Sequence, residues 1–287
     1  NVGHVIGTTD GDTVNVDFRV DNNGRGPKHR EVLRLDRAGI PLEWTVAGTS
    51  LMGGPVEERY RWAAGRASWL SQADRGDVAA PQPKVYVVND DSPWALGVYA
   101  RALLKAPGQR LDVLPPGTMR LETLRPLRLG RGRAAVDGTV YRLQGVGLEP
   151  QLLMLDTRQR LVAQFDDKSA VVRQGYESEV PGLLKLGSEF EVEAVRALQQ
   201  RLAHRSAEPV RIRNVRVFDP GSGRLSVPST VVVMRERIVG VLPLEADADP
   251  TPDQLVIDGE GGTLLPGLHD MHAHSTLRTG LFYLAAG

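Results

Sequence analysis

Short runs of alternating apolar and polar residues dominate the first two thirds of the chain. Residues 13–20 (TVNVDFRV) alternate without a break, and similar runs follow at 30–35, 40–46, 56–62, 85–88, 139–143, 151–156 and 160–165. Alternation with a period of two places every second side chain on one face of a strand. Turn residues separate the runs at irregular intervals, which indicates an antiparallel meander and not a propeller or solenoid. Residues 1–205 therefore predict a mainly β domain.

Two helices are expected to interrupt this β pattern. Ser92 and Pro93 precede an apolar run at 94–104, with serine at the cap position and proline in the first turn. Ser188 is expected to cap a second helix over 189–204, whose apolar residues recur at helical spacing. Residues 206–209 then resemble a linker, so a domain boundary is predicted at 205/206.

Composition limits the class of protein. A chain of 287 residues with 41% hydrophobic content is long enough for two domains with a sizeable core. Lys plus Arg equals Asp plus Glu at 35 each, so no bulk attraction to nucleic acid or membrane is indicated. Cysteine is absent, which excludes disulfides and thiolate metal sites, and no apolar run is long enough to span a membrane.

The first residue, Asn1, is not methionine. This suggests removal of a leader peptide and thus a periplasmic or secreted protein. A trimmed sequence is the alternative explanation, and the two remain open.

Three groups of side chains in residues 1–205 invite a functional interpretation, and each also has a plain structural one. The arginines of RPLRLGRGR could bind a carboxylate or phosphate, or form a solvated strand face. Neighbouring aspartates could hold a metal, or form turns. Four tryptophans could line a groove, or fill the core. These residues are Arg125, Arg128, Arg131 and Arg133; Asp90, Asp91, Asp166 and Asp167; and Trp44, Trp62, Trp69 and Trp94.

The segment LLPGLHDMHAH at 264–274 holds the strongest candidate for a metal site. In a strand, Asp270, His272 and His274 would share one face, so two imidazoles could reach one ion. A catalytic zinc needs about three protein ligands and an open position. The two histidines are therefore predicted to be part of a metal site.

Strand-like runs at 210–219, 229–234, 238–242 and 255–265 lead into this segment, separated by turns. In this order, with DMHAH at the end, residues 210–287 resemble the start of the amidohydrolase superfamily, specifically its imidazolonepropionase-like and prolidase-like branch. His269 departs from the pattern, because an apolar residue is usual there. It falls on the face opposite the proposed ligands and is interpreted as a packing or surface residue.

The resemblance implies a fold and an activity. The fold would be a small β-sandwich at 206–265, followed at 266–287 by the first strand and helix of a metal-dependent (β/α)₈ barrel. By the same resemblance, His272 and His274 would bind a divalent metal, expected to be zinc, whose activated water would cleave amide or peptide C–N bonds. Only 13 residues follow His274, whereas such a barrel takes about 250. The rest of the barrel is therefore expected from a second polypeptide, and this chain alone is expected to be inactive.

Two functions of different classes follow. The first is the N-terminal portion of a metal-dependent hydrolase that acts on a small-molecule or peptide substrate. The second is a non-catalytic, β-rich binding or structural module that carries a truncated amidohydrolase start. A barrel fragment would expose apolar side chains, which favours a missing partner and hence the first function. The side chains in question are Leu268, Met271, Leu281, Phe282 and Leu284.

Overall fold

The computed structural model describes residues 2–203, 206–273 and 276–286. Contacts within the chain define two compact parts, residues 1–190 and residues 191–287, hereafter unit 1 and unit 2. Each unit has its own sheets and is described by itself.

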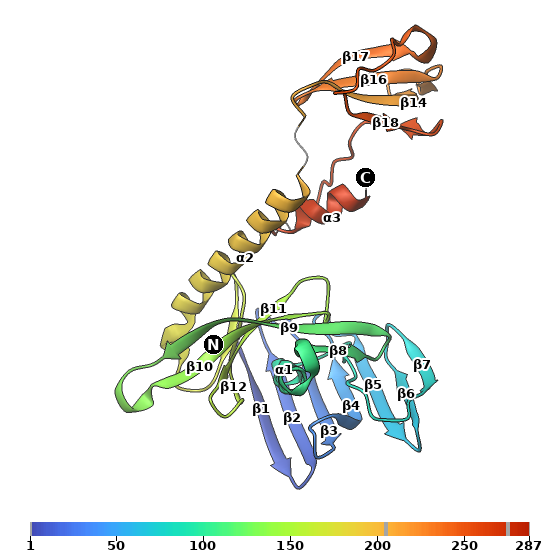
Figure 1. The fold of residues 1–287 in the computed structure, drawn as a ribbon. Coiled ribbons are helices and arrows are strands. Elements are labelled where there is room, and N and C mark those ends of the chain that lie inside the picture. Colours follow the sequence, from blue (N-terminus) through green and yellow to red (C-terminus); the bar gives the residue numbers. More distant parts are fainter. Residues whose placement is uncertain (1, 204–205, 274–275, 287) are drawn as a thin grey trace. The chain divides into compact units, whose positions relative to one another are not determined.

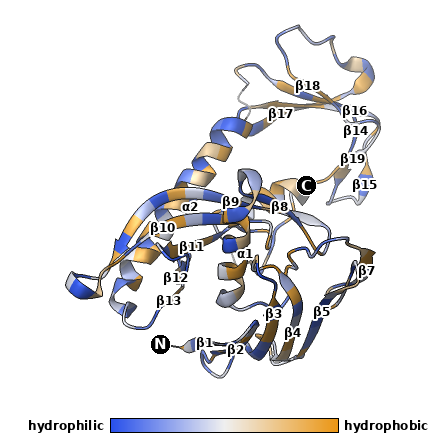
Figure 2. Cartoon of the chain, turned by 60° about the horizontal axis from the view of Figure 1, so that its bottom comes forward, coloured by the Kyte–Doolittle hydropathy of each residue, from blue (hydrophilic) through white to orange (hydrophobic). Residues whose placement is uncertain are grey.

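Unit 1 begins with a seven-stranded antiparallel sheet whose strands follow one another in chain order (Figure 1). On β2 the side chains of Val14, Val16 and Phe18 are buried while the residues between them are less buried, as alternation predicts. Figure 2 shows the same alternation of hydrophobic and hydrophilic residues along β3–β5. The strands are β1 (Gly3–Asp10), β2 (Thr13–Val20), β3 (Lys28–Leu35), β4 (Pro41–Thr49), β5 (Pro55–Ala63), β6 (Arg66–Leu70) and β7 (Arg75–Ala79).

A second antiparallel sheet completes unit 1, with six strands in the order β13-β12-β11-β10-β9-β8. Its strand β11 is buried on both faces, because Leu153 and Leu155 join one core cluster and Leu152 and Met154 join another. The strands are β8 (Arg110–Val113), β9 (Gly117–Leu129), β10 (Val136–Gln144), β11 (Gln151–Asp156), β12 (Leu161–Phe165) and β13 (Ala170–Val172).

Two helices cover the two faces of this second sheet. Helix α1 (Pro93–Lys105) begins at the cap Ser92 and lies between the two sheets, with its buried residues in the first core cluster (Figure 1). Helix α2 (Val180–Leu202) packs its first half, including Leu183 and Phe190, in the second cluster. Gly187 allows the close approach of α2 to the 166–167 turn, because a Cβ there would lie 2.3 Å from the carbonyl oxygen of Asp166.

Unit 2 holds one six-stranded sheet in which β14 is central. Strands β15, β14, β16 and β17 pair antiparallel in that order, and β18 and β19 pair parallel to β14. The elements are β14 (Val210–Asp219), β15 (Arg224–Leu225), β16 (Ser229–Met234), β17 (Arg237–Pro243), β18 (Val256–Asp258), β19 (Thr263–Leu264) and helix α3 (Thr279–Ala286).

The predicted fold class was wrong. The described residues form three mostly antiparallel sheets, and they contain neither a β-sandwich at 206–265 nor the first strand of a (β/α)₈ barrel. Residues 255–265 do not form a hairpin, because β18 and β19 each pair with β14 instead of with one another. Residues 266–273 form no strand at all, since no neighbouring strand offers them backbone partners.

Candidate functional site

A pocket of about 310 Å³ opens in unit 1 beside the segment that connects β7 to α1. Four pieces of chain build it: the β6–β7 turn, residues 86–89, the β8–β9 turn and the loop after β10. The lining residues are Ser71, Ala73, Asp74, Tyr86, Val87, Val88, Asn89, Val113, Pro115, Pro116, Gly117, Gly145 and Val146.

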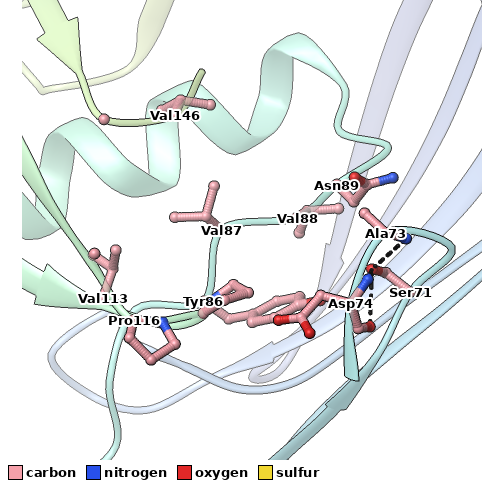
Figure 3. Close-up of a pocket in the computed structure, with 13 residues that line it drawn as sticks. Ser71, Ala73, Asp74, Tyr86, Val87, Val88, Asn89, Val113, Pro116 and Val146 are labelled. Atoms are coloured by element: carbon pink, nitrogen blue, oxygen red, sulfur yellow. Dashed lines mark hydrogen bonds between the residues drawn. The ribbon is translucent and has the colours of Figure 1, made fainter. Parts of the chain in front are cut away.

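Polar and apolar side chains occupy different ends of this pocket (Figure 3). Ser71, Asp74 and Asn89 lie at one end, whereas Val113 and Pro116 lie at the other, with the ring of Tyr86 between them. A molecule bound here would therefore meet a polar group at one end and a hydrophobic wall at the other.

The polar end is built on the turn between β6 and β7. The Ser71 hydroxyl accepts hydrogen bonds from the backbone N–H groups of Ala73 and Asp74, and it donates to the Asp74 carbonyl oxygen over 3.1 Å. The indole N–H of Trp69 donates to one carboxylate oxygen of Asp74 over 3.1 Å, and the backbone N–H of Arg75 donates to the other over 2.7 Å. These bonds fix the orientation of the Asp74 carboxylate.

The wall formed by residues 86–89 is irregular, and a buried glutamate holds it in place. Glu58 on β5 is 2% exposed, and its carboxylate accepts from the Tyr86 hydroxyl over 2.6 Å. It also accepts from the backbone N–H groups of Asn89 and Asp90 over 2.9 Å and 3.1 Å. The strand predicted at 85–88 was wrong: the segment makes only an isolated bridge between Tyr86 and Leu114, and the Val88 N–H donates to the Tyr99 hydroxyl instead of to a neighbouring strand.

Two stacked tyrosines support the same wall. The rings of Tyr60 and Tyr86 are 4.6 Å apart between centroids and nearly parallel, and the Tyr60 hydroxyl donates to the carbonyl oxygen of Lys84. Burial raises the pKa of Tyr60 to about 12, and burial together with the hydrogen bond to Glu58 raises the pKa of Tyr86 further. Tyr86 is therefore a neutral hydrogen-bond donor to Glu58 at physiological pH.

A second buried glutamate holds the start of α1. Glu31 on β3 is fully buried, accepts from the indole N–H of Trp44 over 3.0 Å, and is also hydrogen-bonded by Ser92. Burial raises the pKa of Glu31, although these bonds oppose the shift. Burial and the charges of Glu31 and Glu58 raise the pKa of nearby Asp91 to about 7. The segment from 86 to 92 thus lies over a group of acids.

His29 belongs to the same region. It is 4% exposed, its Nδ1 lies 3.9 Å from Glu31 Oε1, and neither of these two atoms has a hydrogen-bond partner among the described residues. Burial lowers the pKa of His29, so the neutral imidazole is favoured.

Sequence reasoning missed Glu31 and Glu58, although a signal was present. Each sits at an inward position of an alternating strand, Glu31 between His29 and Leu33 on β3 and Glu58 between Val56 and Tyr60 on β5. A charged residue on an otherwise apolar face marks a buried polar group that needs partners.

The structure does not assemble the predicted metal site. Asp270 accepts from the backbone N–H of His272 over 2.9 Å and from the Tyr283 hydroxyl, so it acts as a local structural group. His272 is exposed in an irregular segment, and His274 lies outside the described residues. Within the described ranges no three His, Asp or Glu side chains gather closely enough to hold a metal ion. The assignment of His272 and His274 as ligands stays a prediction.

For several of the other candidates, the structural interpretation is supported and not the functional one. Trp44 and Trp69 are buried, and Trp62 and Trp94 pack against the same core. Asp166 forms a turn by accepting from the backbone N–H groups of Lys168 and Ser169. Among the arginines, Arg125 lies over the Phe190 ring and Arg128 pairs with the exposed Asp137.

Comparisons with known proteins identify no family for this chain. No family model matches the chain, and no curated protein matches it. A crystal structure of a DUF1089 family protein from Pseudomonas aeruginosa matches 57% of this chain and 90% of that one, with 16% sequence identity and a TM-score of 0.35. A likeness this weak carries no argument about the site.

These findings correct the predicted family. The resemblance to the amidohydrolase superfamily was wrong, because no family model and no curated protein of that superfamily matches the chain. The barrel expectation falls with it, since the described residues form no barrel, and they bring no metal-binding group together. A short motif such as His-x-His, preceded by short alternating runs, is too common in unrelated sheets to identify a family alone.

The remaining predictions are either confirmed or stay predictions. In the described part of the chain, no helix combines the length and apolarity needed to cross a bilayer. Leu268, Met271 and Leu284 are exposed, as predicted. Hydrolysis of C–N bonds, a zinc cofactor, a second polypeptide, and periplasmic or secreted location stay predictions.

Proposed function

We propose that unit 1 is a non-catalytic binding module that takes one small amphipathic molecule in the pocket beside residues 86–89. The observation that carries this proposal is a pocket of about 310 Å³ whose wall is fixed by the buried carboxylate of Glu58. Ligand sites are typically preformed hollows of roughly 300–1,000 Å³ with apolar walls and a few placed polar groups.

The chemistry of the lining favours binding over catalysis. Nucleophilic catalysis needs a nucleophile within hydrogen-bond reach of a general base. The Ser71 hydroxyl donates instead to the backbone carbonyl of Asp74, which is not a general base. The lining residues, all of them described, include no histidine or cysteine. This arrangement supports the non-catalytic alternative.

Filling the pocket tests the proposal. Val146 lines it from the loop after β10, whereas Leu148, two residues further along the same loop, is 85% exposed and does not line it. We expect the neutral fluorescent probe phenylnaphthylamine to bind the full chain saturably. Val146→Trp should weaken that binding about tenfold, corresponding to about 1.4 kcal/mol, because the indole takes the space of the probe.

Leu148→Trp is the matched control, since it adds the same side chain to the same loop outside the pocket. Its affinity for the probe should equal that of the unchanged chain. Equal affinities in both variants would refute binding in this pocket, and so would the absence of saturable binding to the unchanged chain.

A further inference from the structure

We infer that the pocket selects molecules whose polar end is a cation, specifically an alkylammonium group. This inference rests on the proposed function, because it names the ligand class for the same pocket. It follows from three separate observations: which hydrogen-bond donors are already used, which acceptors remain, and which charges surround the polar end.

Most hydrogen-bond donors of the polar lining side chains already donate to other protein groups. The single O–H of Ser71 donates to the Asp74 carbonyl, and the single O–H of Tyr86 donates to Glu58. The amide of Asn89 donates one N–H to Asp90 over 2.8 Å. Asp74, when ionised, has no donor at all. A ligand therefore finds few side-chain donors.

Backbone donors in the wall are used as well. The N–H groups of Val87 and Val88 donate to the Leu114 carbonyl and the Tyr99 hydroxyl. The N–H of Asn89 donates to Glu58, and Pro115 and Pro116 in the opposite turn have no N–H. The backbone thus offers a ligand little more than the side chains do.

Acceptors remain available at the polar end. Each carboxylate oxygen of Asp74 has two lone-pair positions, and one protein donor contacts each oxygen. Asn89 also carries an amide oxygen at this end. An ammonium group has three donors and no acceptor, so it complements this set. A carboxylate or phosphate would bring only acceptors to it.

The charges around the polar end of the pocket also favour a cationic ligand. Asp74 faces the pocket, and none of its described lining residues is Lys, Arg or His. Behind the wall lies the carboxylate of Glu58, whose hydrogen-bond partners among the described residues, Tyr86 and two backbone N–H groups, are all neutral. A cation at the polar end would be attracted to Asp74 directly and to Glu58 at longer range, whereas an anion would be repelled by both.

Three probes with the same alkyl chain separate these possibilities: octylamine, octanol and octanoate, titrated calorimetrically into the full chain at neutral pH. We expect octylammonium to bind about fivefold more tightly than octanol, the upper range for a solvent-exposed ion pair, and octanoate to bind most weakly. Asp74→Asn keeps the shape of the side chain and should remove the fivefold preference for octylammonium over octanol.

Asp77→Asn is the matched control. Asp77 is an exposed aspartate on β7 that pairs with Arg66 and does not line the pocket, so its loss removes the same charge elsewhere on the strand. The preference for octylammonium should persist in this variant. Equal or tighter binding of octanol or octanoate by the unchanged chain would overturn the inference but leave the proposed function intact. Binding of none of the three probes would overturn both.

Discussion

The two units differ in how many apolar side chains they bury. Unit 1 buries large apolar side chains in two clusters that involve both sheets, α1 and the first half of α2. Among the described residues of unit 2, the buried apolar side chains are Val215 and Val231. Hydrophobic burial scales with the area removed from water, so unit 2 gains much less from it.

The two units also differ in the partners of their buried carboxylates. In unit 2, the carboxylate of Asp247 has no exposed surface and contacts the guanidinium groups of Arg211 and Arg213 and the hydroxyl of Thr230. In unit 1, Asp156 is likewise buried against Arg160 and Arg173, but Glu31 and Glu58 are buried with neutral partners. We infer that Asp247 and its two arginines organise the small core of unit 2, whereas in unit 1 Glu58 holds the pocket wall and Glu31 the start of α1, both at some cost in stability.

The largest expected effect is the loss of unit 2 when its ion network is broken. Asp247→Ala leaves two arginines without their anion, and removal of one partner from a buried pair typically costs about 3–5 kcal/mol. We expect amide hydrogen exchange in β14 and β16 to accelerate to the rate of an unfolded segment. All four tryptophans lie in unit 1, so their fluorescence should be unchanged.

Asp249→Ala is the control for this experiment, because Asp249 is an exposed aspartate on the same loop. Slow exchange in β14 and β16 of Asp247→Ala would contradict the role assigned to the network.

The next largest effect concerns the pocket wall of unit 1. Glu58→Ala leaves the Tyr86 hydroxyl and two backbone N–H groups without their acceptor, which should lower the free energy of unfolding of unit 1 by about 2 kcal/mol. This free energy of unfolding is measured by urea unfolding monitored by tryptophan fluorescence. Glu57→Ala, on the exposed face of the same strand, should change the free energy by less than about 0.5 kcal/mol. Similar losses in both variants would show that Glu58 does not hold the wall.

Much of the local structure of unit 1 could be predicted from sequence, since alternation reports which face of a strand is buried. The strand at 13–20 and the helix beginning after Ser92 are confirmed. The start of α2 was placed nine residues late, at Glu189 instead of Val180, because Pro181 and Gly182 resemble a break. Proline is tolerated in the first turn of a helix, and burial of Leu183 and Leu186 favours the earlier start.

The pocket could not be predicted, because its lining comes from four segments that only the pairing of distant strands brings together. Tyr86 and Asp74 are 12 positions apart, and Val146 is a further 60 away. Glu58 shows the general difficulty. Its position on an apolar face predicts that it needs partners, but the partners lie some 30 residues further along the chain.

A smaller effect should appear as a dependence of unit 1 stability on pH. The pKa of Asp91 is about 7 in the folded chain and 3.8 ordinarily, so the folded state binds more protons between these values. The free energy of unfolding should therefore fall as pH rises from about 4 to about 7, with a slope of at most about 1.4 kcal/mol per pH unit from this group. The raised pKa of Glu31 also lowers the free energy of unfolding as pH rises.

Asp91→Asn should flatten this slope, measured by urea unfolding with tryptophan fluorescence at each pH. The pKa of His29 is lowered by burial, which costs stability as pH falls below about 6.5 and so acts in the opposite direction. Asp77→Asn, at an exposed carboxylate, should leave the slope as it is. An unchanged slope in Asp91→Asn would mean that Asp91 does not carry the effect.

The smallest effect compares two serines that the sequence assigned the same role. The Ser92 hydroxyl accepts from the backbone N–H of Trp94 at the start of α1 and is hydrogen-bonded to Glu31, whereas Ser188 lies exposed inside α2. Ser92→Ala should cost about 1 kcal/mol, the usual value for a lost helix cap. Ser188→Ala should be neutral or stabilise by a few tenths of a kcal/mol, since alanine is the better interior helix former. Equal costs in urea unfolding would mean that Ser188, and not Val180, marks the start of the second helix.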